Sequence, residues 1–167
     1  MKKYFIYTKH LGMRFITKGD SKYLQIIDKD PVVKKFFPEG TLTNEKINEF
    51  INECIVSCKN ENLPCLVIFQ LKDDDFVGEA YFGQLETGEF KIGYLLHEKY
   101  WNKGYATEIL EALLTWAKNH IDTEYIIAFA DIDNTASFRV MEKCGMKYYK
   151  DGRHLDMDCH YYRIKNR

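Results

Sequence analysis

The turn from Trp101 to Thr107 leads directly into an amphipathic helix, and its residue types are suited to holding an anion. The first N–H groups of a helix lack intrahelical acceptors and carry partial positive charge, so phosphate binds there readily. Gly104 has no β-carbon and lets the backbone approach a bulky anion, while small Ala106 and Thr107 leave the first helical turn open. Lys103 adds a positive charge. The turn therefore predicts a phosphate site, although an ordinary loop can have the same composition.

Two common phosphate-binding motifs do not describe this turn. The GxxxxGK[ST] spacing of a P-loop is absent, and so is the GxGxxG fingerprint of a dinucleotide-binding fold. We therefore expect a different phosphate-bearing ligand.

The elements before the turn predict one strand, two helices and a three-stranded meander. Residues 13–17 have β character, and a helical region then starts at Gly19-Asp20-Ser21 and is interrupted by Pro31. Thr43 can cap a second helix, because apolar residues recur at helical spacing after it. Three β runs separated by turn residues, 65–71, 76–85 and 89–96, indicate an antiparallel meander.

The elements after the turn complete a mixed α/β domain. An apolar stripe predicts a helix from Tyr105 onward, and residues 125–132 predict a buried strand. A short helix follows, with Asn134 near its start and Gly145 as its stop, and two β runs end the chain. The predicted order β-α-α-β-β-β-α-β-α-β-β is an α/β (α+β) fold with helices on a largely antiparallel sheet.

Length, composition and charge exclude several classes of protein. A chain of 167 residues suits a single domain, 1–167, and 46% apolar with 29% charged residues is typical of a folded soluble protein. The 24 basic and 25 acidic side chains create no global field that attracts nucleic acid or an anionic membrane. Because the sequence lacks a signal-peptide pattern and a run of about 20 apolar residues, we expect a cytoplasmic location.

The cysteines favour free thiols over disulfides or a metal site. Their number is five, and none forms a CxxC pair. Cys54 and Cys58 share a helix face, but no histidine lies nearby in the sequence to complete a zinc site. We therefore expect no metal cofactor.

Residues 101–106 resemble the pyrophosphate-loop motif Q/R-x-x-G-x-G/A of the GNAT superfamily of acyl-CoA-dependent N-acetyltransferases. Gly104 and Ala106 match this motif, and Trp101 stands where the family has Gln or Arg. With this tryptophan, the stretch YWNKGYATE looks like the RimJ/RimL-like branch, which includes ribosomal-protein N-terminal acetyltransferases. A second block, NTASFRVMEKCGM at 134–146, is similar to the next helical element of the family. Together the two blocks indicate a GNAT-like domain over most of the chain.

The resemblance implies acetyl-CoA as cosubstrate and a position for it. In the family, the pantetheine arm lies where two neighbouring strands splay apart, and the corresponding strands here are KIGYLL and IIAFADI. By this resemblance, the backbones of Leu95 and Leu96 would hold the arm from one side and Asn134 from the other. The pyrophosphate would be held by the backbone N–H groups of Asn102, Lys103, Gly104, Tyr105, Ala106 and Thr107.

The residue that protonates the departing thiolate is not the usual one. Many family members carry a tyrosine seven residues after the asparagine, and here this position is Met141, which has no proton to donate. Ser137 lies four residues earlier on the same helix face and can present its hydroxyl toward the thiol. The RimJ/RimL-like branch often carries serine at this position. Alternatively, Ser137 only satisfies local backbone groups, and water protonates the thiolate.

Acetyl transfer also needs an unprotonated amine, so a base is expected. Glu79, in the middle of a predicted strand, is the first candidate and Glu98, beside the turn, is the second. His97, His154 and His160 are further candidates. A solvated carboxylate or a packed histidine would explain any of these residues equally simply.

The only indication of which amine accepts the acetyl group is the pKa of that amine. A terminal α-amine titrates near 8 and a lysine amine near 10.4, so exposing the lone pair of the α-amine requires about 3 kcal/mol less at neutral pH. We expect an N-acetyltransferase in which a primary amine, of a protein N-terminus or a small molecule, attacks acetyl-CoA directly within a ternary complex. Polyamines, aminoglycosides and amino-acid derivatives remain open as acceptors.

A noncatalytic acyl-CoA-binding module is the alternative function. We expect the protein to be a monomer or a homodimer.

Overall fold

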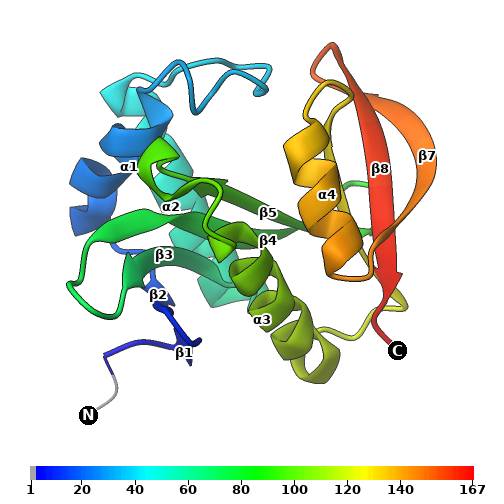
Figure 1. Cartoon of the computed structure of the whole chain (residues 1–167), viewed down its shortest axis with the longest axis horizontal. Helices are drawn as coiled ribbons and strands as arrows, with labels where there is room; N and C mark the ends of the chain where they lie inside the picture. The colour runs from blue at the N-terminus through cyan, green and yellow to red at the C-terminus, as the bar shows by residue number, and fades with distance from the viewer. Residues whose placement is uncertain (1–2) are drawn as a thin grey trace.

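The computed structural model describes residues 3–167 as a twisted eight-stranded sheet with helices on both faces (Figure 1). The strand order is β1-β2-β3-β4-β5-β6-β8-β7, and every neighbouring pair is antiparallel except β5 and β6. The strands are β1 (Ile6–Tyr7), β2 (Leu11–Phe15), β3 (Cys65–Gln70), β4 (Phe76–Gln84), β5 (Phe90–Leu96), β6 (Tyr125–Asp131), β7 (Lys147–His154) and β8 (Met157–Lys165). The predicted fold class and meander are confirmed.

Within residues 3–167, four α-helices pack on this sheet, and each begins where the sequence indicates. They are α1 (Ser21–Asp28), α2 (Asn44–Glu61), α3 (Tyr105–His120) and α4 (Thr135–Lys143). The Thr43 side chain accepts a hydrogen bond from the Lys46 N–H and caps α2, while Asn134 caps α4. Gly145 follows the end of α4 with φ of 89°, a backbone conformation that favours glycine.

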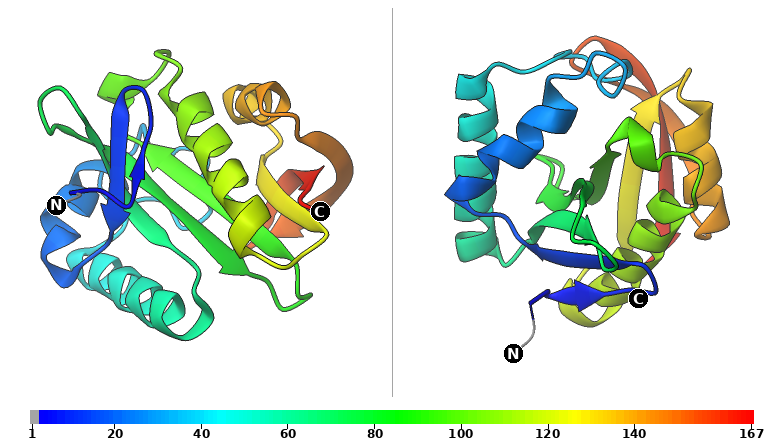
Figure 2. Two further views of the ribbon diagram at one scale, coloured as in Figure 1. Left: turned by 90° about the horizontal axis from the view of Figure 1, so that it is seen from below. Right: turned by 60° about the vertical axis from the view of Figure 1, so that its left-hand side comes forward.

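The alternation of side chains along β3 divides the core into two layers. Leu66 and Ile68 face α3 and α4, whereas Val67 and Phe69 face α1 and α2. Because successive side chains of a strand point to opposite faces, an uninterrupted apolar strand of this kind can be covered on both sides. Figure 2 shows α2 against one face of the sheet and α3 against the other.

One strand is missing from the prediction. β1 pairs with β2 only at Ile6 and Tyr7, and the hairpin between them contains Lys9 and His10. A two-residue strand carries too little alternation to be recognised, so the hairpin is visible only in the structure.

The sheet opens between its two halves. β5 and β6 are parallel neighbours, but they pair only at Phe90 with Ile126 and at Lys91 with Ile127. Beyond these residues the strands diverge toward the start of α3, and the two halves separate as seen in Figure 1. The splayed strands predicted from the sequence are therefore confirmed, and the open end of the sheet is the natural position for a ligand.

Residues 3–167 lack two kinds of feature, a membrane-crossing helix and a cluster of metal-binding side chains. None of their helices is both long enough and apolar enough to cross a bilayer. Across the same residues, no three His, Cys, Asp or Glu side chains gather as a metal-binding group.

Candidate active site

A cleft of about 710 Å³ occupies the gap between β5 and β6. The start of α3, the helix α4, and the segment between α1 and α2 form its other walls. Nearly all predicted site residues line this cleft: Glu79, Leu95, Leu96, Asn102, Gly104, Tyr105, Ala106, Thr107, Asn134 and Ser137. Lys103 is the exception among the predicted loop residues, since it is exposed and does not line the cleft.

The helix start at Gly104 has the geometry of an anion site. Gly104 has φ of 80° and Asn102 has φ of 60°, so both residues adopt the left-handed conformation and turn the chain sharply into α3. The first backbone bond of the helix runs from the Glu108 N–H to the Gly104 carbonyl. Within residues 3–167, no acceptor receives the N–H groups of Tyr105, Ala106 or Thr107.

The space in front of these donors is open. A β-carbon placed on Gly104 would meet no atom within 4 Å, so the left-handed φ, rather than a close neighbour in the protein, requires glycine there. Three unpaired N–H groups beside open space are donors for a ligand oxygen. A pyrophosphate group fits this site.

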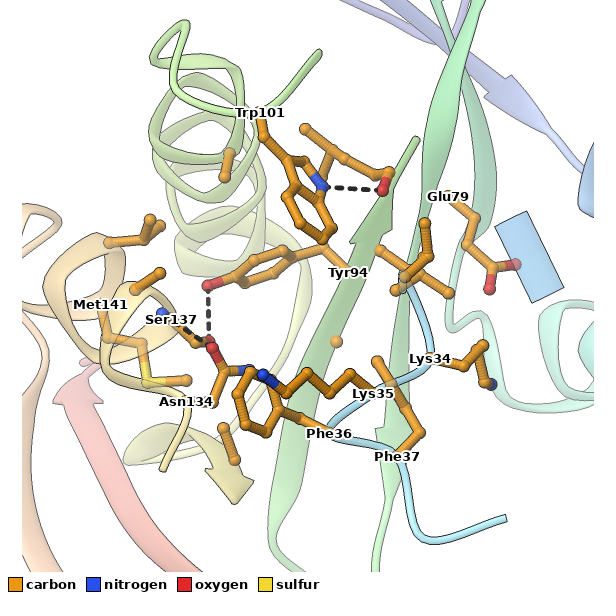
Figure 3. Close-up of a pocket in the computed structure, with 18 of the residues that line it drawn as sticks. Lys34, Lys35, Phe36, Phe37, Glu79, Tyr94, Trp101, Asn134, Ser137 and Met141 are labelled. Atoms are coloured by element: carbon orange, nitrogen blue, oxygen red, sulfur yellow. Dashed lines mark hydrogen bonds between the residues drawn. The ribbon is translucent and has the colours of Figure 1, made fainter. Parts of the chain in front are cut away.

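Trp101, which departs from the family motif, ties the loop to the strand before it. Its indole N–H donates to the carbonyl of Leu96 at 2.9 Å (Figure 3). The loop and the end of β5 are therefore held together by a side chain that also lines the cleft.

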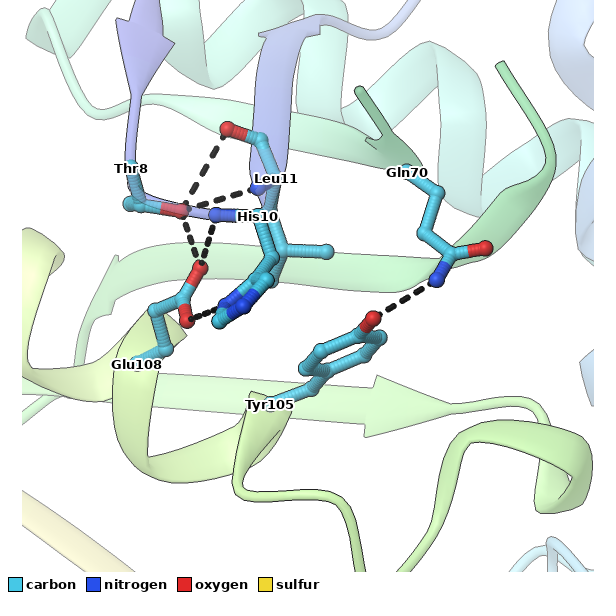
Figure 4. A network of polar contacts seen from close by, with 6 residues as sticks. All are labelled: Thr8, His10, Leu11, Gln70, Tyr105 and Glu108. Carbon is cyan, nitrogen blue, oxygen red and sulfur yellow. Dashed lines mark hydrogen bonds and ion pairs between the residues drawn. The ribbon is translucent and has the colours of Figure 1, made fainter. Parts of the chain in front are cut away.

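Tyr105 contributes to the site through its backbone, because its side chain points into the core. The ring is buried and stacks on Tyr100, with ring centroids 5.9 Å apart. Its hydroxyl hydrogen-bonds with the Gln70 side chain at 2.6 Å (Figure 4). This contact fixes the first turn of α3 against β3.

The first turn of α3 is also held by the N-terminal hairpin. Glu108 receives hydrogen bonds from the Thr8 hydroxyl and from the His10 backbone N–H, the latter at 3.0 Å, and pairs with the His10 ring at 2.8 Å (Figure 4). Burial alone would raise the pKa of Glu108, but the hydrogen bonds from His10 and Thr8 outweigh it and lower this pKa. The β1–β2 hairpin thus holds in place the start of α3, which carries the free N–H groups.

On the opposite wall of the cleft, Ser137 meets a tyrosine from β5. The Ser137 hydroxyl lies 3.2 Å from the Tyr94 hydroxyl, and Figure 3 shows the two side chains pointing toward each other. The helix is capped by the Asn134 side chain, which accepts from the Ser137 N–H at 3.3 Å, so the Ser137 hydroxyl is not needed as a cap. Met141 is buried beside them and lines the same wall.

Tyr94 is a functional candidate that the sequence reasoning missed. Nothing in the sequence pairs it with Ser137, because 43 residues separate the two. The alternation along β5 is the one available signal, since it places Tyr94 on the same face as Ile92 and Leu96, toward α3. Burial raises the pKa of Tyr94 to about 12, despite the opposing hydrogen bond with Ser137, so the hydroxyl keeps its proton at neutral pH.

Glu79 lies on the other face of the sheet, where α1 and α2 pack. It is directly opposite Leu95 in the β4–β5 ladder, and its side chain is only 4% exposed. Burial, reinforced by the charge of Asp28, raises the pKa of Glu79 well above its usual value. Its Oε2 atom has no hydrogen-bond partner in the described part of the chain.

The remaining candidate bases are less well placed. Glu98 is exposed and lies outside the cleft, and the His97 ring accepts from the Lys99 N–H at 3.0 Å. The His160 ring pairs with Asp151 at 2.6 Å. His154 lines the cleft, and burial together with the charge of Lys91 lowers its pKa.

Comparison with known families identifies the class of protein. The model of a family described as an acetyltransferase (GNAT) domain matches residues 10–147. The chain therefore belongs to the GNAT family, and it is an acetyl-CoA-dependent acetyltransferase.

Individual relatives agree with this assignment. YnaD of Bacillus subtilis (strain 168), described as an uncharacterized N-acetyltransferase, is 31% identical over 146 residues, which cover 85% of this chain and 82% of YnaD. The crystal structure of a GNAT-family acetyltransferase from Bacillus anthracis superposes with a TM-score of 0.81 at 29% identity, over 96% of this chain and 98% of that one.

The branch predicted from the sequence is represented by RimL, the ribosomal L7/L12 α-N-protein acetyltransferase, whose structure contains coenzyme A. RimL superposes with a TM-score of 0.81 over 95% of both chains, at 19% identity. At this identity the likeness shows a shared fold, and it agrees with the predicted RimJ/RimL-like resemblance.

Proposed function

We propose that this protein transfers acetyl from acetyl-CoA to a primary amine, by direct attack of the amine on the thioester within a ternary complex. The observation that carries the proposal is the presence of two complementary features in one cleft. One wall has the unpaired N–H groups of Tyr105, Ala106 and Thr107, and another has the hydroxyl pair of Tyr94 and Ser137. We propose further that residues 1–167 act as one catalytic domain.

The first part of the proposal concerns the cosubstrate. The N–H groups at the start of α3 hold the pyrophosphate, and the backbones of Leu95 and Leu96 hold the pantetheine arm in the gap beside β5. The side-chain nitrogen of Asn134 is the donor that this residue has left, because its oxygen caps α4. The coenzyme A bound to RimL, which has the same fold, supports this placement.

The second part concerns the protons. The amine nitrogen bonds to the carbonyl carbon, the carbon–sulfur bond breaks, and the sulfur leaves as thiolate. The Tyr94 hydroxyl, oriented by Ser137, donates a proton to this thiolate and regains one from solvent. Glu79 receives the proton that the amine loses, directly or through water. This assignment gives Tyr94 the role that the usual tyrosine has at the position of Met141.

Thermal unfolding with and without acetyl-CoA tests the cosubstrate. At about 100 times the dissociation constant, binding adds about 2.7 kcal/mol to the free energy of unfolding, equivalent to a rise in Tm of roughly 5 to 10 °C. An amine panel, followed by release of free CoA thiol, then tests transfer. Tight binding with no turnover on any amine would favour a noncatalytic acyl-CoA-binding module instead.

Direct transfer has its own test. Enzyme incubated with labelled acetyl-CoA and no amine should remain unlabelled after removal of the ligand. A stable acetyl-cysteine adduct, for example on Cys144, would contradict direct transfer.

A further inference from the structure

Two buried carboxyl groups with unused oxygens line the face of the cleft that lies away from Tyr94 and Ser137. Asp28, at the end of α1, is 2% exposed, and Glu79 is 4% exposed. Both residues line the cleft, and the Asp28 Oδ2 and Glu79 Oε2 atoms have no hydrogen-bond partner among residues 3–167. Buried carboxyl oxygens are normally hydrogen-bonded, so both atoms have unused capacity to accept a hydrogen bond.

Within residues 3–167, a single cation lies within ion-pair distance of this pair. The Lys34 ammonium lies 3.6 Å from the Asp28 Oδ1 atom and 3.0 Å from the Glu39 carboxylate. No ion pair in the described residues involves Glu79. Among residues 3–167, Lys34 is therefore the one cation within ion-pair distance of Asp28, and the other basic residues of the cleft, Lys35, Lys91, Arg139 and Lys143, form no ion pair with Asp28 or Glu79.

The pKa values of the pair reflect its burial and its single ion pair. Burial raises the pKa of Asp28 to about 6, although Lys34 acts in the opposite direction. Burial, reinforced by the charge of Asp28, raises the pKa of Glu79. A cation bound between the two would lower both pKa values and would favour the ionised carboxylates.

From this geometry we infer that the acceptor carries a second ammonium group, held by Asp28 while the reacting amine gives its proton to Glu79. The inference rests on the proposed transfer to amines and specifies its substrate class as a small aliphatic diamine or polyamine. The apolar chain between the two nitrogens would lie against aromatic residues of the same cleft, Phe37, Phe50 and Tyr81. A protein N-terminus carries no second ammonium of its own and would leave the Asp28 Oδ2 atom unpaired.

The test compares two acceptors of similar length and amine basicity. 1,4-Diaminobutane has the second amine, and n-pentylamine has a methyl group in its place. We expect the wild-type kcat/KM for the diamine to be at least about tenfold higher, as for one hydrogen bond to a charged group. In Asp28→Asn, the ratio of the two kcat/KM values should fall below about threefold. Glu53→Gln, an exposed position on α2 outside the cleft, should keep the wild-type ratio.

Wild-type rates alone can overturn the inference, even if Asp28→Asn does not fold. Similar kcat/KM values for both amines would contradict it while leaving the proposed acetyltransferase activity in place. A peptide with a free N-terminal serine that outperforms the diamine would also contradict it and would favour a protein acceptor. No turnover with any amine would overturn the proposed function itself, and this inference with it.

Discussion

The Tyr94 hydroxyl of β5 and the Ser137 hydroxyl of α4 lie 3.2 Å apart across the cleft that separates the two halves of the sheet. Their partnership bridges the gap where β5 and β6 have stopped pairing. Tyr94 is half-buried, and burial raises its pKa to about 12, so its hydroxyl keeps the proton at neutral pH. It is thus a proton donor whose orientation depends on a residue from another element.

Replacing either hydroxyl should slow the chemical step. We expect Tyr94→Phe to lower kcat by about 100-fold, because positioned acids contribute two to four powers of ten. Ser137→Ala should lower kcat less, and the double variant should be no slower than Tyr94→Phe, because the serine acts through the tyrosine.

Steady-state rates with acetyl-CoA and a reactive amine measure these effects. Tyr148→Phe is the matched control, since it removes an exposed tyrosine hydroxyl on the edge strand β7. An unchanged kcat in Tyr94→Phe would mean that water protonates the thiolate.

The contrast between Tyr94 and Gly104 shows which parts of the site a sequence can reveal. The turn at Gly104, the cap at Thr43 and the meander are encoded by spacing between near neighbours, and all three are confirmed. The Tyr94–Ser137 pair depends on two elements that meet only in the folded sheet. The same applies to Asp28 and Glu79, which come from α1 and β4, so neither partnership has a local signal.

The left-handed conformation at Gly104 predicts two separable effects of a β-carbon. Gly104→Val should lower the free energy of unfolding by about 1–3 kcal/mol, because a β-branched residue is strained at φ of 80°. It should also weaken acetyl-CoA binding, because the side chain would fill the open space beside the free N–H groups.

Gly88→Val separates the two effects. Gly88 has φ of 89° in the β4–β5 turn, and a β-carbon there also meets no atom within 4 Å. We expect a similar loss of stability with unchanged acetyl-CoA affinity, measured by urea unfolding and by calorimetric titration. If Gly104→Val and Gly88→Val bound acetyl-CoA with equal affinity, the start of α3 would not be part of the cosubstrate site.

The buried Asp28 carboxyl predicts an unusual pH dependence of stability. Its pKa of about 6 in the folded protein exceeds the ordinary 3.8, so between these values the folded state holds more protons than the unfolded state. Stability therefore decreases as pH rises from about 4 to 6. The difference between 3.8 and about 6 is equivalent to about 3 kcal/mol.

Asp28→Asn removes this titration. Relative to the wild type, the free energy of unfolding of the variant should rise by about 2 kcal/mol between pH 4 and pH 7, in addition to any pH-independent effect of removing one partner of Lys34. Urea unfolding at several pH values measures this change. For Asp133→Asn, at an exposed position before α4, the free energy of unfolding should instead have the same pH dependence as in the wild type.

Glu108 predicts the opposite pH dependence, because its pKa is lowered on folding. Its hydrogen bonds to Thr8 and His10 stabilise the protein above the ordinary carboxyl pKa, and this contribution is lost as pH falls through the lowered pKa. We expect Glu108→Ala to reduce the free energy of unfolding by about 1–3 kcal/mol at neutral pH and by less in acid. Glu111→Ala, one turn along and exposed, should have little effect at either pH.

The contact of the hairpin with Glu108 predicts a second effect, because it holds the helix start in place. Glu108→Ala should increase amide exchange at Leu11 and Met13 and weaken acetyl-CoA binding. Unchanged amide exchange would show that pairing within the sheet alone holds β1 and β2 in place.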